Sequence, residues 1–153
     1  MGWTRIDRSR WKREEYFRHY YEDVPCFYSM TVPLDVTRLR AAGLRLYPAM
    51  LYLLSRAVNR HEEFRCALVN GEVGVYDALS PSYTVFHKET ETFSNLWTEY
   101  CGDYPRFLER YGEDLRLYGG LEGFSPKPGE PDNLFTVSML PWASFEGFHL
   151  HLP

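Results

Sequence analysis

Apolar residues recur at helical spacing in the stretch that starts at Pro48, and this pattern predicts the clearest helix of the chain. Proline is favoured in the first turn of a helix, where its missing N–H has no partner to lose. The apolar positions cover most of the helix circumference, so we expect a largely buried helix that runs to about residue 63. These positions are Met50, Leu51, Leu53, Leu54, Ala57 and Val58.

A polar helix studded with aromatic residues is predicted over residues 10–22. Asp7 and Ser9 are its candidate N-caps, and it is expected to end before Pro25, because the residue that precedes a proline avoids helical dihedrals. The aromatic side chains are expected to share one broad face of this helix. They are Trp11, Tyr16, Phe17 and Tyr20.

Two more helices carry recognisable start and stop signals. A short helix is predicted between Pro33 and Gly43, because glycine commonly ends a helix. Asp103 is expected to cap a helix that runs to about Tyr118, with Pro105 in its first turn. The glycine- and proline-rich residues 119–132 that follow are predicted to form a loop.

Asn70-Gly71 lies between two runs of strand-forming residues, 64–69 and 72–76, and predicts a β-hairpin. A type I′ turn requires two residues that tolerate positive φ, and this dipeptide supplies them. Further strands are predicted over 26–32, 82–88, a run around Val137 that ends at Pro141, and 148–152. Helices and hairpins alternate along the chain, so we expect an α/β (α+β) domain with a mixed sheet.

The composition is that of one ordinary globular domain spanning residues 1–153, with 44% hydrophobic and 25% charged residues. A net charge of −4 without a basic stripe argues against a nucleic-acid partner. No apolar run approaches the length of a membrane span, so no membrane association is expected. Cys26, Cys66 and Cys101 are odd in number and far apart, which favours reduced cysteines in the cytoplasm.

Several titratable residues are candidates for both catalytic and structural roles. Glu89 and Glu91 would share one face of a strand like a catalytic carboxylate pair, whereas in a turn they would be solvated and inert. His87 beside them is a candidate base or a hydrogen-bonded structural residue. His149 and His151 alternate as two potential metal ligands, but no third ligand lies at a useful spacing, and polar alternation on a half-exposed strand is the favoured interpretation.

Cys26 follows Pro25 into an apolar run without a histidine nearby in the sequence. A buried packing thiol is therefore favoured over a nucleophile. The chain also contains no phosphate-binding loop, dinucleotide fingerprint or nucleophile elbow. Motif chemistry alone thus indicates a soluble α/β domain without an evident active site.

Five stretches together resemble the chloramphenicol acetyltransferases, in the same order along essentially the whole chain. They are residues 11–14 (WKRE), 20–26 (YYEDVPC), 47–52 (YPAMLY), 84–94 (TVFHKETETFS) and 140–145 (LPWASF). The resemblance implies a two-layer CoA-dependent acyltransferase fold with a mixed sheet packed by helices. It also implies a homotrimer with active sites between subunits, antibiotic resistance as the biological role, and no metal.

The activity that the resemblance implies is transfer of acetyl from acetyl-CoA to a hydroxyl of chloramphenicol or a similar small molecule. In the family a histidine acts as general base on the acceptor hydroxyl, and a serine hydroxyl stabilises the oxyanion of the tetrahedral intermediate. Arg13 matches an arginine that pairs with an aspartate near that histidine. The positions that match the family's acceptor pocket are Tyr20, Val24, Cys26, Tyr28, Phe93 and, in a loosely aligned loop, Phe124.

Three departures from the family pattern qualify this expectation. The catalytic His-His-x-x-x-Asp-Gly motif is expected beyond Pro153, so the chain is expected to be C-terminally incomplete, inactive alone and marginally stable. Gly147 aligns with the oxyanion serine, and His19 replaces an aromatic residue of the acceptor pocket. Two alternatives to the enzyme remain open: a catalytically dead binding or assembly module of the same fold, and a metal-binding protein that uses His149 and His151.

Overall fold

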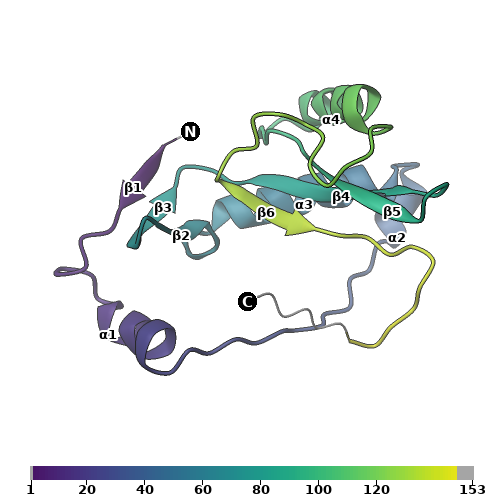
Figure 1. Ribbon diagram of the computed structural model, residues 1–153. Coiled ribbons are helices and arrows are strands. Elements are labelled where there is room, and N and C mark those ends of the chain that lie inside the picture. The colour runs from purple at the N-terminus through teal and green to yellow at the C-terminus, as the bar shows by residue number, and fades with distance from the viewer. Residues whose placement is uncertain (1, 148–153) are drawn as a thin grey trace.

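The computed structural model of the protein describes residues 2–147, and Figure 1 shows how their elements are arranged. The helices are α1 (Glu14–Phe17), which continues into a π-helical turn η1 (Arg18–Asp23), α2 (Thr37–Ala41), α3 (Leu46–Arg60), a 3-10 turn η2 (Glu62–Arg65) and α4 (Tyr104–Tyr118). The strands are β1 (Trp3–Arg5), β2 (Cys66–Val69), β3 (Glu72–Tyr76), β4 (Ser80–His87), β5 (Thr92–Trp97) and β6 (Leu134–Val137).

The described strands form two three-stranded sheets. The first has the order β1-β3-β2 and is antiparallel throughout. The second has the order β5-β4-β6, in which β4 pairs antiparallel with β5 and parallel with β6. The predicted mixed α/β architecture is therefore confirmed, with the mixed pairing confined to the second sheet.

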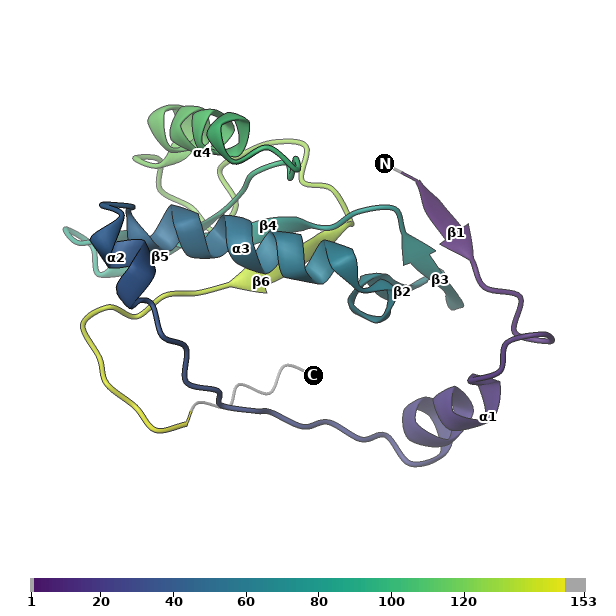
Figure 2. The same ribbon diagram turned by 180° about the vertical axis from the view of Figure 1, so that it is seen from behind.

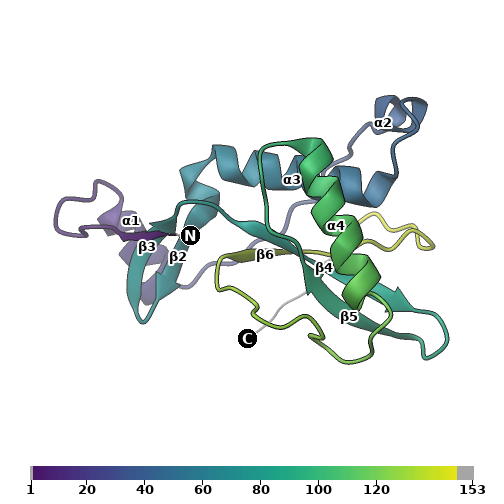
Figure 3. The same cartoon turned by 90° about the horizontal axis from the view of Figure 1, so that it is seen from above.

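The core lies where α3 and α4 pack on the second sheet (Figure 3). Leu51, Tyr83, Leu96 and Phe107 are completely buried, one from each of α3, β4, β5 and α4. Their neighbours are also largely aromatic, and Tyr83 lies 5.3 Å from Tyr111 between ring centroids. The core is therefore built mainly from tyrosine and phenylalanine rings.

The helix predicted from Pro48 is confirmed as α3, but its predicted burial is wrong in part. It buries a single stripe, whereas Leu53 is 39% exposed and Ala57 is exposed. Within the described residues α3 covers the second sheet with one face only, as Figure 2 shows, so its outer apolar residues have no layer above them. Pro48, Ala49, Leu51, Tyr52 and Ser55 form the buried stripe.

The N-terminal helix is shorter than predicted, because α1 starts only at Glu14. The Asp7 carboxylate accepts hydrogen bonds from the amide and hydroxyl of Ser9, so it stabilises a turn before the helix and caps nothing. The aromatic face also differs from the prediction. Phe17 stacks on Tyr21 with ring centroids 5.2 Å apart, and Trp11 packs on the same ring of Phe17.

The strand predicted over residues 26–32 is wrong: the segment is extended and exposed but pairs with no described strand. High strand propensity does not make a strand without a partner, and the flanking Pro25 and Pro33 each lack an N–H donor. The strand around Val137 ends at that residue instead of at Pro141. The strand predicted over 148–152, with His149 and His151, lies outside the described residues.

The other predicted elements are confirmed within a few residues of their bounds: α2, the loop over 119–132, α4 and β4. In α4 the Asp103 carboxylate accepts a hydrogen bond from the Arg106 amide at 2.9 Å, as expected of an N-cap. The hairpin is also confirmed, because Val69 pairs with Glu72, and Asn70 and Gly71 have φ of 52° and 79°.

Gly71 gives a stability prediction with a matched control. Gly71→Ala should lower the free energy of unfolding by about 1 kcal/mol, because an alanine is strained at positive φ. Gly112→Ala should raise it by about 0.5–1 kcal/mol, since Gly112 lies inside α4 and a Cβ added there would meet nothing within 4 Å. Urea denaturation measures both, and two shifts of the same sign would contradict the assigned turn or helix.

Candidate active site

An apolar cavity of about 470 Å³ lies between the β4–β5 hairpin, α4 and the segment that follows β6. Its walls include Tyr47, Phe86, Phe93, Tyr111, Leu140 and Trp142. The Phe86 and Trp142 rings pack 5.1 Å apart, which closes one side. An aromatic cavity of this size suits a small, largely apolar ligand.

Tyr47 supplies the polar group in this wall. Its hydroxyl lies 3.2 Å from the carbonyl oxygens of both Thr84 and Val137, so it bridges the two parallel strands β4 and β6. Burial raises the pKa of the Tyr47 hydroxyl, which keeps it a neutral donor. Tyr47 therefore has a structural role, because its hydroxyl links β4 to β6.

Phe93 and Phe124, two of the residues predicted to line the acceptor pocket, lie together with ring centroids 6.2 Å apart. Phe93 also reaches the apolar cavity, and both residues line a shallow hollow beside the β4–β5 turn. The loop that carries Phe124 is joined to β5 by a hydrogen bond from the Asn95 amide to the Phe124 carbonyl oxygen, 2.7 Å long. The structure therefore brings Phe93 of the hairpin next to Phe124 of the 119–132 loop.

The remaining predicted pocket residues lie on the N-terminal arm, residues 18–34, which Figures 1 and 2 show running apart from the second sheet. All of them are exposed, and Tyr28 is 83% exposed. They are His19, Tyr20, Val24, Cys26 and Tyr28. In the single chain the structure does not bring this group to the Phe93–Phe124 pair.

Cys26 departs from its sequence interpretation, because its thiol is exposed and not a buried packing group. The cause is the missing strand, since an extended segment without a sheet partner buries neither face. Cys66 and Cys101 also carry free thiols.

Arg8 shapes the start of the arm, a role that the sequence did not indicate. Its guanidinium binds both carboxylate oxygens of Glu14, at 2.8 and 2.6 Å, and one of Glu22 at 2.9 Å. It also lies 5.0 Å from the centre of the Phe17 ring. The hydrogen bonds from Arg8 lower the pKa of the Glu14 carboxyl, so this clamp is present at neutral pH and weakens as acid protonates Glu14.

Arg13 and Gly147 occupy positions that the resemblance singles out. The Arg13 guanidinium lies 3.4 Å from a Glu63 carboxylate oxygen, and both side chains are exposed. Gly147 lies next to the arm, because a Cβ added to it would be 3.7 Å from the Thr31 hydroxyl oxygen. The end of the described chain therefore returns to the arm.

The histidine and carboxylates of the 84–94 stretch are not arranged as a catalytic group. Glu89 and Glu91 are exposed in the turn between β4 and β5, so the solvated interpretation holds. The His87 Nε2 atom lies 2.7 Å from the Ser94 hydroxyl oxygen, inside the hairpin. His87 is thus a hydrogen-bonded residue of the sheet.

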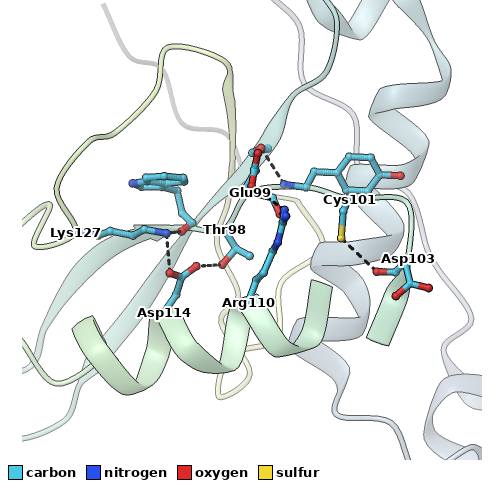
Figure 4. Close-up of polar contacts among 10 residues, drawn as sticks. Thr98, Glu99, Cys101, Asp103, Arg110, Asp114 and Lys127 are labelled. Carbon is cyan, nitrogen blue, oxygen red and sulfur yellow. Dashed lines mark hydrogen bonds and ion pairs between the residues drawn. The ribbon is translucent and has the colours of Figure 1, made fainter. Parts of the chain in front are cut away.

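A buried polar network lies on the far side of α4, beside a second cavity of about 580 Å³ (Figure 4). The Lys127 ammonium lies 2.7 Å from one Asp114 carboxylate oxygen, and the Thr98 hydroxyl donates to the other at 2.7 Å. Lys127 also donates to the Trp97 carbonyl and lies 3.6 Å from the centre of that ring. Every charge in this network is satisfied, so it anchors the 119–132 loop to α4.

Within residues 2–147 no group of three histidine, cysteine or acidic side chains is placed to hold a metal ion. In the same part of the chain, no helix has the length and apolarity to cross a bilayer.

The fold matches that of a solved chloramphenicol acetyltransferase, with a TM-score of 0.80 over 98% of this chain and 75% of that one, at 23% sequence identity. The architecture is therefore that of the chloramphenicol acetyltransferase fold. The family model described as "Chloramphenicol acetyltransferase" matches residues 1–153. The chain belongs to the chloramphenicol acetyltransferase family, which is a family of acyltransferases.

Individual relatives agree with this assignment. The chain is 54% identical to the chloramphenicol acetyltransferase of Campylobacter coli over 153 residues, which cover 99% of this chain and 74% of the relative. It is 51% identical to a Clostridium perfringens chloramphenicol acetyltransferase with the same coverage, and 41% identical to one from Escherichia coli over 99% of this chain and 70% of that relative.

Proposed function

We propose that this protein serves CoA-dependent O-acetylation, in which the acetyl group of acetyl-CoA passes to a hydroxyl of chloramphenicol or a similar small molecule. The observation that carries the proposal is the 54% identity to a chloramphenicol acetyltransferase over 99% of the chain. The Phe93–Phe124 pair supports it, because two neighbouring aromatic rings beside an apolar cavity suit an aromatic acceptor.

The acceptor site is completed between subunits of a homotrimer. Two observations support this part of the proposal. The arm residues Tyr20, Val24 and Tyr28 are apolar or aromatic yet more than half exposed, and they lie apart from the Phe93–Phe124 pair in the single chain. Contact with a neighbouring subunit would bury these side chains and bring both groups to one acceptor.

The chemistry requires a general base on the acceptor hydroxyl. The base removes the hydroxyl proton as the acceptor oxygen attacks the thioester carbonyl, and the CoA thiolate leaves and takes up a proton. His87 does not fill this role, because its Nε2 is engaged with Ser94 inside the hairpin. The family resemblance assigns this role to a histidine of the His-His-x-x-x-Asp-Gly motif, which residues 1–153 do not contain, so these residues alone are expected to be inactive.

Stabilisation of the oxyanion differs from the family pattern, because Gly147 offers no hydroxyl. Its backbone N–H is the donor that remains at this position. We expect the reaction to take place in the cytoplasm, and no step of it calls for a metal.

A catalytically dead binding or assembly module is the second candidate. Gly147 at the serine position favours it, because loss of one oxyanion donor slows such reactions by about 100- to 1,000-fold. Such a module would still bind the acceptor but would not turn it over.

Binding of chloramphenicol tests the acceptor site directly. Phe93→Ala should raise the dissociation constant about tenfold, because the ring contributes apolar contact area to the ligand. Phe64→Ala is the matched control, since Phe64 is an exposed phenylalanine next to His61 and remote from the cavity. Equilibrium dialysis that showed equal affinity for the two variants, or no binding by the parent protein, would refute the acceptor site.

A further inference from the structure

The Ser94 side chain is completely buried at the centre of a polar cluster on β5. Its hydroxyl oxygen lies 2.6 Å from the Gly123 carbonyl oxygen, 3.1 Å from the Leu121 carbonyl oxygen and 2.7 Å from His87 Nε2. His87 reaches it as a diagonal neighbour, because Val85 is opposite Ser94 and His87 is two residues further on the same face of β4.

The single hydroxyl proton decides the direction of each hydrogen bond. Carbonyl oxygens only accept, so Ser94 must donate to one of them, and the Gly123 carbonyl at 2.6 Å is the closer. The Ser94 oxygen must then accept from His87, which requires a proton on His87 Nε2. The opposite direction, with Ser94 donating to His87, would leave the Gly123 carbonyl oxygen only 2.6 Å from a hydroxyl oxygen with no proton between them.

The Gly123 carbonyl belongs to the peptide plane that precedes Phe124. The plane that follows Phe124 is also held, because the Phe124 carbonyl oxygen accepts from the Asn95 amide at 2.7 Å. Fixing both planes fixes the φ and ψ angles of Phe124, and these set the direction of its side chain. Gly123 itself has φ of 112°, a conformation that glycine adopts easily.

The Phe124 ring is 70% exposed, so surrounding side chains do little to hold it. Its position against Phe93 therefore depends on the backbone of its loop. We infer that His87 and Ser94 are positioning residues for the acceptor wall: the His87 Nε2–H, acting through the Ser94 hydroxyl, holds the Gly123 carbonyl and so sets Phe124 opposite Phe93. This assignment rests on the proposed function in so far as Phe124 contacts the acceptor.

The first test needs no acceptor. Long-range ¹H–¹⁵N spectra recorded at about pH 8, where a free histidine is neutral, report which ring nitrogen carries the proton. We expect His87 to be protonated on Nε2, with its signal assigned by its loss in His87→Gln. A proton on Nδ1 would overturn the inference.

Hydrogen exchange tests whether His87 and Ser94 stabilise the loop that carries Phe124. Ser94→Ala and His87→Leu should speed exchange of the Asn95 amide by roughly five- to tenfold, as expected for the loss of one hydrogen bond. His87→Gln should stay near the parent rate, because its amide places a donor close to the position of Nε2. Thr92→Ala is the control, since this exposed residue lies on the same strand and its hydroxyl is hydrogen-bonded to Thr90 and not to the loop. Equal Asn95 exchange in Ser94→Ala and Thr92→Ala would overturn the inference.

Measuring acceptor binding shows whether Ser94 acts by positioning Phe124 or only by stabilising the fold. Ser94→Ala should weaken chloramphenicol binding several-fold, but it should add little to Phe124→Ala, because both act through the same ring. Additive effects in this double-mutant cycle would contradict a role through Phe124. If the parent protein binds no chloramphenicol, the proposed function fails, while the tautomer and the exchange rates still decide whether His87 and Ser94 hold the loop.

Discussion

Replacing Phe107 with alanine is expected to lower the free energy of unfolding by about 3–5 kcal/mol, the usual cost of removing a phenylalanine from a packed core. Phe107 is completely buried, and its ring lies 5.7 Å from that of Tyr52, so α4 and α3 meet at this residue. Alanine would bury less apolar surface than phenylalanine. It would also leave a cavity, because the close packing of α3 and α4 prevents the helices from moving in to fill it.

Leu117→Ala is the matched control for Phe107, because it lies on the same helix and is 44% exposed. It should cost well under half as much as Phe107→Ala. Urea denaturation at one fixed protein concentration measures both variants, since association would otherwise shift the apparent stability. A loss below about 1 kcal/mol for Phe107→Ala would mean that α4 is not packed as described.

Asp114→Ala is expected to cost about 3 kcal/mol, because it leaves the Lys127 ammonium in a largely buried place without its carboxylate. The Thr98 hydroxyl also loses its acceptor. The loop over 119–132 should loosen as a result, since Lys127 joins it to α4. Denaturation measures the loss of stability, and exchange of the loop amides measures the loosening.

Two comparisons make the Asp114 test specific. Glu113→Ala removes the neighbouring but exposed carboxylate and should change stability by less than about 0.5 kcal/mol. The double variant Asp114→Leu with Lys127→Met should be more stable than Asp114→Ala alone, because an apolar pair leaves no buried charge. If the double variant is the less stable one, the pair is not the source of the effect.

The elements that were predicted correctly are those whose signals are local. The hairpin follows from the backbone tolerance of Asn70 and Gly71, and α4 follows from the capping carboxylate of Asp103. β5 was missed because the turn before it contains no glycine or proline. In that turn Glu91 has a φ of 52°, which is an uncommon conformation for glutamate and cannot be predicted from the sequence.

The errors arose where a property depends on partners elsewhere in the chain. Residues 26–32 have the composition of a strand, but pairing requires a neighbouring strand. The Lys127–Asp114 pair joins residues 13 positions apart through the packing of a loop on α4, which periodicity does not reveal.

The candidate site depended on resemblance more than on pattern. Five stretches, 84–94 among them, indicated the family, and the family resemblance indicated Phe93 and Phe124, whose rings meet edge to face with centroids 6.2 Å apart. The contributions of His19, Tyr20, Val24, Cys26 and Tyr28 stay predictions, because they lie on the exposed arm. The sequence does not indicate the Ser94 cluster, since its partners come from two separate segments, β4 and the 119–132 loop.

The most direct test of the proposed acetyl transfer is release of the CoA thiol from acetyl-CoA in the presence of chloramphenicol. The 153-residue chain should be compared with a chain extended by the C-terminal segment of the Campylobacter coli relative, and with that extended chain after the histidines of the added segment are replaced by alanine. The account predicts turnover only in the extended chain that keeps its histidines. An extended chain that folds and binds chloramphenicol but releases no CoA would contradict the account and favour the binding module.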